Sequence, residues 1–173
     1  EGYSPSPQER QSWLQISYMK EAYHTMGPKF TLGWMAEALY SSKNFSENYT
    51  ATMMQAGEFA PTPHSKLMYN EAFRANQYVA AGIKPIYVLN DMFQFRTEFY
   101  GFTPIFPIKK NALNKAYYGK AFSRFEYMGE VSVICHLPFG AISAYVNHYS
   151  SPRREWNVGM TIGWQLFNYR FVE

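Results

Sequence analysis

Strict alternation of apolar and polar side chains, with a period of two residues, is the feature that most constrains this chain. Residues 93–99 read Phe-Gln-Phe-Arg-Thr-Glu-Phe, so Gln94, Arg96 and Glu98 alternate with aromatic or neutral neighbours. Successive side chains of a β-strand point to opposite faces of a sheet, whereas one face of an α-helix recurs every three to four residues. The segment is therefore predicted to be a strand with one aromatic face and one charged face.

The same alternation recurs along the chain, which predicts an all-β, antiparallel sheet of about eight strands. No amphipathic helix is predicted, and residues 1–173 are expected to form one domain. Gly82 and Pro85 predict a bulge within one of the weaker strands. Strands are predicted at 29–41, 93–99, 124–133, 142–147 and 157–166, and with weaker patterns at 12–24, 48–55 and 74–89.

Composition and strand length favour a membrane barrel over a soluble sandwich. Aromatic residues make up 19% of the chain, an excess that suits the aromatic girdles of outer-membrane barrels as well as soluble cores. Most predicted strands reach about ten residues, enough to cross a bilayer at a tilt. Long loops at 57–73 and 102–119 alternate with short turns over the C-terminal part, as in such barrels. The first connection is short where this rule prefers a long one.

Several function classes lack the residues that they need. The net charge of +3 is dispersed, which argues against nucleic-acid binding. Cys135 is the single cysteine, so neither an internal disulfide nor a cysteine-based zinc site is expected. The four histidines show no metal spacing, and no metal or cofactor is expected. No Gly-x-Ser-x-Gly nucleophile motif occurs, so the chain is not expected to be an enzyme by itself.

Two blocks carry a resemblance to a known family. Residues 59–65 (Phe-Ala-Pro-Thr-Pro-His-Ser) and 73–82 (Phe-Arg-Ala-Asn-Gln-Tyr-Val-Ala-Ala-Gly) resemble the C-terminal barrel of Bacteroidetes patatin-like phospholipases, and the likeness extends through 93–100 to 163–167. Those barrels belong to the surface-antigen superfamily of sixteen-stranded outer-membrane pores. The resemblance implies the C-terminal half of such a transmembrane β-barrel, in the bacterial outer membrane. It also implies contact with outer-membrane lipid and with the barrel-assembly machinery, and raises a homo-oligomer as an option.

The resemblance also assigns roles to particular segments. The loop at 57–73 falls where the family has a long loop that folds inward and ends in Arg-Gly-Phe or Arg-Gly-Tyr. Phe73-Arg74-Ala75 is the nearest match, and its missing glycine and aromatic residue argue against an insertase function. By analogy with the family, Arg74 would pair with Glu98. Tyr169-Arg170-Phe171 resembles the terminal strand signal of barrel proteins, although two residues follow it.

These observations lead to one prediction and two alternatives. The barrel segment would anchor an upstream patatin-like lipase domain and help to translocate it. The main alternative is a soluble β-barrel or sandwich that binds an apolar ligand inside, with Arg96, Glu98 and Glu126 on its outside; the other is a self-contained eight-stranded barrel. The polar residues predicted to face the lumen are Glu37, Arg74, Gln94, Arg96, Glu98, Arg124, Glu126 and Glu130. The residues predicted to face lipid are Phe30, Trp34, Phe93, Phe95, Phe99, Tyr127, Ile162 and Trp164.

Overall fold

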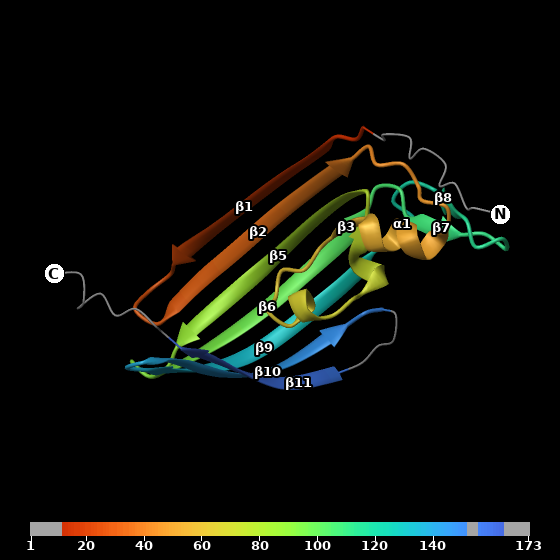
Figure 1. Ribbon diagram of the computed structural model, residues 1–173. Helices are drawn as coiled ribbons and strands as arrows, with labels where there is room; N and C mark the ends of the chain where they lie inside the picture. Colours follow the sequence, from red (N-terminus) through yellow and green to blue (C-terminus); the bar gives the residue numbers. More distant parts are fainter. Residues whose placement is uncertain (1–11, 152–155, 165–173) are drawn as a thin grey trace.

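One antiparallel sheet of seven long strands dominates the fold (Figure 1). The computed structural model describes residues 12–151 and 156–164. Neighbours in the sheet follow the order β1-β2-β5-β6-β9-β10-β11, so each long strand pairs with the next long strand along the chain. The seven strands are β1 (Gln15–Thr25), β2 (Phe30–Ser41), β5 (Gln77–Val88), β6 (Phe93–Pro104), β9 (Glu126–Leu137), β10 (Gly140–Tyr149) and β11 (Trp156–Trp164).

The connections carry the remaining elements. Between β2 and β5 lie α1 (Tyr49–Gln55), β3 (Gly57–Glu58), the short 3-10 helices η1 (Ser65–Leu67) and η2 (Glu71–Phe73), and β4 (Arg74–Ala75), which pairs with β3. Between β6 and β9 lies a hairpin of β7 (Ile108–Lys110) and β8 (Ala116–Tyr118). The antiparallel β class is confirmed. In the described residues β1 and β11 are the edges of the sheet and do not pair with each other, so the closed barrel stays a prediction.

The prediction of a strand at 48–55 is wrong, because this segment is the helix α1. The Asn48 side chain accepts a hydrogen bond of 2.8 Å from the Ala51 amide and so caps the helix N-terminus. Tyr49 and Met53 lie one helical turn apart, and both pack with Ile108 in a small apolar cluster. Apolar residues at 49, 51 and 53 satisfy both the strand and the helix period over so short a stretch.

Gly82 and Pro85 do not form the predicted bulge. The pairing of β2 with β5 runs without a shift from Met35 opposite Gly82 to Leu32 opposite Pro85. The register of β5 with β6 is likewise the same on both sides of Pro85. Gly82 has a packing role instead, because the Tyr100 ring from β6 lies over its Cα and would overlap a Cβ there.

Removing 48–55 from the strand count makes the connections alternate throughout the sheet. The turns that follow β1, β5 and β9 are short. The connections at 42–76, 105–125 and 150–155 are longer. In an antiparallel meander the short turns lie together at one end of the sheet, and the connections at 42–76 and 105–125 lie together at the other (Figure 1). The anomaly at the first connection therefore came from counting a helix as a strand.

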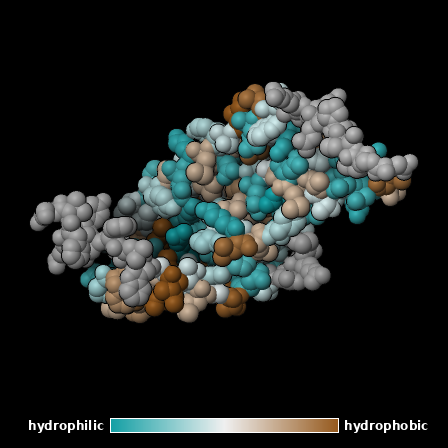
Figure 2. All heavy atoms as spheres, viewed as in Figure 1, coloured by the Kyte–Doolittle hydropathy of each residue, from teal (hydrophilic) through white to brown (hydrophobic). Residues whose placement is uncertain are grey.

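The sheet has two unlike faces. Residues 57–75, here called the covering segment, lie over one face of the sheet. We call this face the inner face and the opposite one the outer face. The inner face holds buried Tyr78, Tyr100 and Phe102 together with the charged residues. The outer face exposes large apolar side chains, among them Ile83 (51% exposed) and Val158 (80% exposed). Figure 2 shows mainly hydrophilic residues across the middle of the molecule and hydrophobic residues over β11.

The contact between Gly82 and the Tyr100 ring generates a stability prediction. Gly82→Ala should destabilise the fold by about 1–3 kcal/mol, because the new methyl group overlaps a ring that is itself fully buried. Gly129→Ala is the matched control in β9, another strand of the same sheet, where a Cβ would lie 3.6 Å from the nearest side-chain atom. Urea titrations followed by tryptophan fluorescence would compare the two, and equal free-energy losses would contradict the packing role of Gly82.

Candidate functional site

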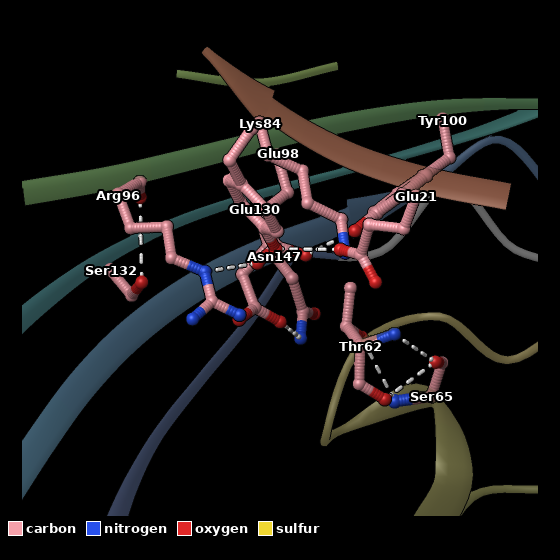
Figure 3. Close-up of polar contacts among 11 residues, drawn as sticks. Glu21, Thr62, Ser65, Lys84, Arg96, Glu98, Tyr100, Glu130, Ser132 and Asn147 are labelled. Atoms are coloured by element: carbon pink, nitrogen blue, oxygen red, sulfur yellow. Dashed lines mark hydrogen bonds and ion pairs between the residues drawn. The ribbon is translucent and has the colours of Figure 1, made fainter. Parts of the chain in front are cut away.

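Glu98 is the centre of a buried polar network on the inner face (Figure 3). Its side chain is 2% exposed, although it lies in the middle of a strand. The Arg96 guanidinium forms an ion pair with one carboxylate oxygen, and the Tyr100 hydroxyl donates a hydrogen bond to the other. Residues two apart on a strand share a face, so β6 alone supplies all three groups. A buried carboxylate requires such partners, because losing water is otherwise very costly.

A second ion pair connects two strands that are not neighbours. Lys84 on β5 is buried and pairs with Glu21 on β1, and the Tyr23 hydroxyl donates to Glu21 at 2.6 Å. Strand β2 lies between β1 and β5, and at this point it carries Gly33. A Cβ on Gly33 would lie 3.1 Å from the Lys84 Cβ and closer still to the Tyr23 ring. The glycine thus leaves the space through which Glu21 and Lys84 meet.

Glu130 brings a second buried carboxylate beside Glu98. The two residues are directly opposite each other in the pairing of β6 with β9. Like charges at such positions repel. The Asn147 amide lies 3.5 Å from the Glu130 carboxylate. Glu130 therefore has a neutral partner, whereas Glu98 has a cation.

Aromatic packing holds the covering segment on the inner face. Phe59 is almost fully buried and contacts three rings of the sheet, those of Tyr78, Tyr100 and Phe102, with centroid distances of 5.8–6.1 Å. Phe73 packs on Phe102 at 5.6 Å and on Tyr149 at 6.1 Å. The loop predicted at 57–73 thus lies against the inner face of the sheet.

A tight turn at 62–65 brings His64 to the sheet. The Thr62 amide donates to Ser65 Oγ at 2.9 Å, and Ser65 Oγ donates to the Thr62 carbonyl at 2.8 Å. His64 Nδ1 lies 2.9 Å from the Tyr149 hydroxyl, and its ring also packs on Tyr145. Burial disfavours the charged imidazolium and lowers the pKa of His64 below its usual value of 6.5.

Arg74 does not form the predicted pair with Glu98. It forms an ion pair with Glu58, its direct partner in the β3–β4 pairing, and donates to the Met54 carbonyl at 3.2 Å. Its guanidinium also lies 4.8 Å from the centre of the Tyr69 ring. Arg74 therefore stabilises the covering segment from within, and Arg96 is the cation beside Glu98.

Arg124 links the connection before β9 to the covering segment. Its guanidinium donates to the carbonyl oxygen of Ala72 and lies 3.4 Å from Glu126. Glu126 in turn accepts a hydrogen bond of 2.6 Å from the Ser150 hydroxyl. The charged groups at this end thus join β9 to two different connections.

The predicted division of residues between two faces agrees with the strand register. Glu37, Gln94, Arg96, Glu98, Glu126 and Glu130 lie on the inner face. Phe30, Trp34, Phe93, Phe95, Phe99, Tyr127 and Ile162 lie on the outer face. The Trp164 side chain and the triplet Tyr169-Arg170-Phe171 fall outside what the structure describes. Whether the two faces meet a lumen and lipid stays a prediction.

Four inner-face residues were not predicted, namely Glu21, Lys84, Tyr100 and Asn147. Glu21 and Lys84 lie in strands with weak alternation, and their partnership depends on the glycine between them. Asn147 is the last residue of the strand predicted at 142–147 and was not among the residues assigned to the lumen. One signal for the pair of Glu21 and Lys84 was available in the sequence. Lys84 is a charged residue within an otherwise apolar strand.

Neither a metal site in the described residues nor a family is identified for this chain. Within 12–151 and 156–164, no three His, Cys, Asp or Glu side chains are grouped so that they could hold a metal ion. No helix in the same part of the chain is both long and apolar enough to span a membrane. Comparisons with protein-family models, with curated proteins and with solved structures find no match for this chain.

Phe59 is predicted to hold the covering segment in place. Phe59→Ala should cost about 3–5 kcal/mol, the usual loss for a buried phenylalanine, and should speed amide hydrogen exchange across residues 57–75. Leu67→Ala in the same segment is the control, because Leu67 is 85% exposed and should change exchange little. Comparable effects of both variants would show that the Phe59 contacts do not hold the segment.

The lowered pKa of His64 predicts a pH dependence. Unfolded His64 binds a proton near pH 6.5, whereas the folded state binds it at lower pH, so stability should fall as the pH drops through 6.5. Hydrogen exchange of residues 61–67 at pH 7.5 and pH 5.5, corrected for intrinsic rates, would report this loss. His64→Gln keeps a hydrogen-bonding side chain and should remove that part of the pH dependence; an unchanged dependence in the variant would refute the role of His64.

Proposed function

We propose that this chain is a segment of an outer-membrane β-barrel, in which the outer face contacts lipid and the inner face lines a polar interior partly filled by the covering segment. The observation that carries this proposal is the inversion of the two faces. Glu98, Glu126 and Glu130 are buried, whereas large apolar side chains are exposed across the opposite face. A soluble protein rarely exposes an apolar surface that extends over a whole sheet.

The distribution of aromatic residues on the outer face supports a membrane location. Phe30, Tyr87 and Phe95 lie in one row across β2, β5 and β6, near the short turns. Tyr127 and Trp156 lie on the same face near the longer connections. Outer-membrane barrels place aromatic residues at both lipid interfaces in this way, and their short turns face the periplasm. By this rule the covering segment lies on the external side.

The alternative of a soluble barrel with an apolar interior has less support. Such a barrel would bury the row of Phe95, Phe99 and Val131 and expose the carboxylates of the opposite face. In the structure the reverse holds: Glu98 is buried, and the strand register places Phe95, Phe99 and Val131 on the exposed face. An interior that binds an apolar ligand would also have to accommodate the ion pairs of Arg96 and Lys84.

The role of the barrel is inferred from the resemblance. Residues 59–65 and 73–82 are similar to the barrel of patatin-like phospholipases of Bacteroidetes, in which a lipase domain precedes the barrel. We infer that this segment anchors such a domain at the outer membrane and helps to translocate it, after insertion by the barrel-assembly machinery. The chain's own residues would contribute no ester hydrolysis.

Site-directed labelling tests the assignment of the faces. Single cysteines at Trp34, Phe95 and Ile162, in a Cys135→Ser background, should carry spin labels that collide with oxygen dissolved in lipid. Labels at Glu37, Gln94 and Thr161, on the opposite face of the same three strands, should instead collide with a water-soluble nickel reagent. Because the members of each pair lie on one strand, at most three residues apart, the two sets are at similar depths. The opposite pattern would establish the soluble alternative.

A further inference from the structure

The connection between β6 and β9 carries an unbalanced positive charge. Residues 99–125 contain Lys109, Lys110, Lys115, Lys120 and Arg124 but no aspartate or glutamate. All four lysines are exposed, and among the described residues none of them forms an ion pair. The chain's net charge is only +3, so this connection is strongly basic relative to the rest.

The β7–β8 hairpin within this connection has one docked side and one free side. Ile108 packs with Met53 of α1, and the opposite residue Tyr118 packs on Phe45 at 4.5 Å. The next cross-strand pair, Lys109 and Tyr117, points away from these contacts and is exposed. The docked side fixes the hairpin on the protein, which leaves the basic and aromatic side available.

Exposed apolar side chains accompany the lysines. Leu113 at the hairpin tip is 77% exposed, and Phe122 is 62% exposed. Phe122 has a φ of 51°, a left-handed conformation that is unfavourable for a bulky residue and is often found at functional sites. Its amide donates to the Ile105 carbonyl at 2.9 Å, which holds the residue in this conformation. The backbone thus keeps an aromatic ring in the solvent.

The connection is continuous with the outer face of the sheet. Phe125, the residue just before β9, is exposed, and its ring lies over Gly101 on β6, where a Cβ would be 3.0 Å from it. The apolar surface proposed to meet lipid therefore extends from the sheet to the end of the connection that carries the lysines. Lysines next to exposed apolar side chains are typical of segments that lie at a membrane interface.

We propose that the β7–β8 connection docks on the phosphate-bearing headgroups of the surrounding lipid. Lys109, Lys115 and Lys120 contact the lipid phosphates, while Leu113 and Phe122 insert between the headgroups. This inference rests on the proposed membrane location and adds a lipid class to it. Charge alone would also suit a nucleic acid or an acidic polysaccharide, but neither explains an exposed leucine or the continuity with Phe125.

A partition experiment tests the charge requirement. The chain in detergent is diluted into vesicles of phosphatidylcholine alone or mixed with phosphatidylglycerol, and the ratio of bound fractions gives the preference for phosphate lipid. In the triple variant Lys109→Gln, Lys115→Gln, Lys120→Gln, this ratio should fall about fivefold for each lysine that is replaced. The control double variant Lys29→Gln, Lys66→Gln removes lysines that lie neither in this connection nor on the outer face, and should retain the preference. Equal losses per lysine in the two variants would overturn the proposal.

Environment-sensitive labels separate this inference from the proposed function. A nitrobenzoxadiazole group is attached to a cysteine at Leu113 or at Val131 of the outer face, in a Cys135→Ser background. Blue-shifted emission at both sites on the mixed vesicles supports the inference. A lipid signal at Val131 with a water signal at Leu113 overturns the inference and leaves the barrel proposal intact. Water signals at both sites overturn both. Soluble heparin that binds as well as the mixed vesicles, with Leu113 in water, identifies a polyanion site instead.

Discussion

Burial of Glu98 is the constraint on which the rest of the sheet depends. A carboxylate that is 2% exposed must keep its partners, and these lie on its own strand at Arg96 and Tyr100. Because side chains alternate, turning these three residues inward turns Phe95 and Phe99 outward. A register shift by one residue would reverse both faces at once, which would put the charges outside and leave the aromatic rings beside Lys84. The exposed apolar face is therefore a direct consequence of where the charges are buried.

The covering segment and the polar network depend on each other. Phe59 closes over Tyr100, whose hydroxyl donates to Glu98, so the segment helps to exclude water from the network. A lower local dielectric strengthens the ion pairs, but it also raises the cost of any group without a partner. The two-residue pairing of β3 with β4, fixed by Arg74 and Glu58, closes the segment so that Phe59 and Phe73 reach the sheet together.

The strands and their faces could be predicted from local alternation, whereas the pairing of residues far apart in the sequence could not. Residues 93–99 carry a polar side chain at every second position, and their face assignment followed directly. Over 48–55 the apolar spacing fits two periods, and the Asn48 cap decided in favour of a helix. Arg74 was matched with Glu98 by resemblance, but strands β3 and β4 are too short to show any pattern, so Glu58 could not be identified as its partner. The contact of Glu21 with Lys84 required the order of three strands and the position of Gly33, none of which is encoded locally.

The two edges of the sheet limit how the proposed membrane location can be realised. Strands β1 and β11 each offer one row of backbone N–H and C=O groups without a strand partner in the described residues. Water can satisfy such groups, but hydrocarbon cannot, and each group left without a partner in lipid costs several kcal/mol. The apolar side chains of β1 and β11, including Tyr18 and Val158, are nevertheless exposed toward the same side as those of the central strands. A sheet with this outer face can therefore reside in a bilayer only when both edges pair with further strands, supplied by the same protein or by a second copy. Edge pairing and lipid contact are thus one requirement, because each apolar edge strand needs a neighbour before it can leave water.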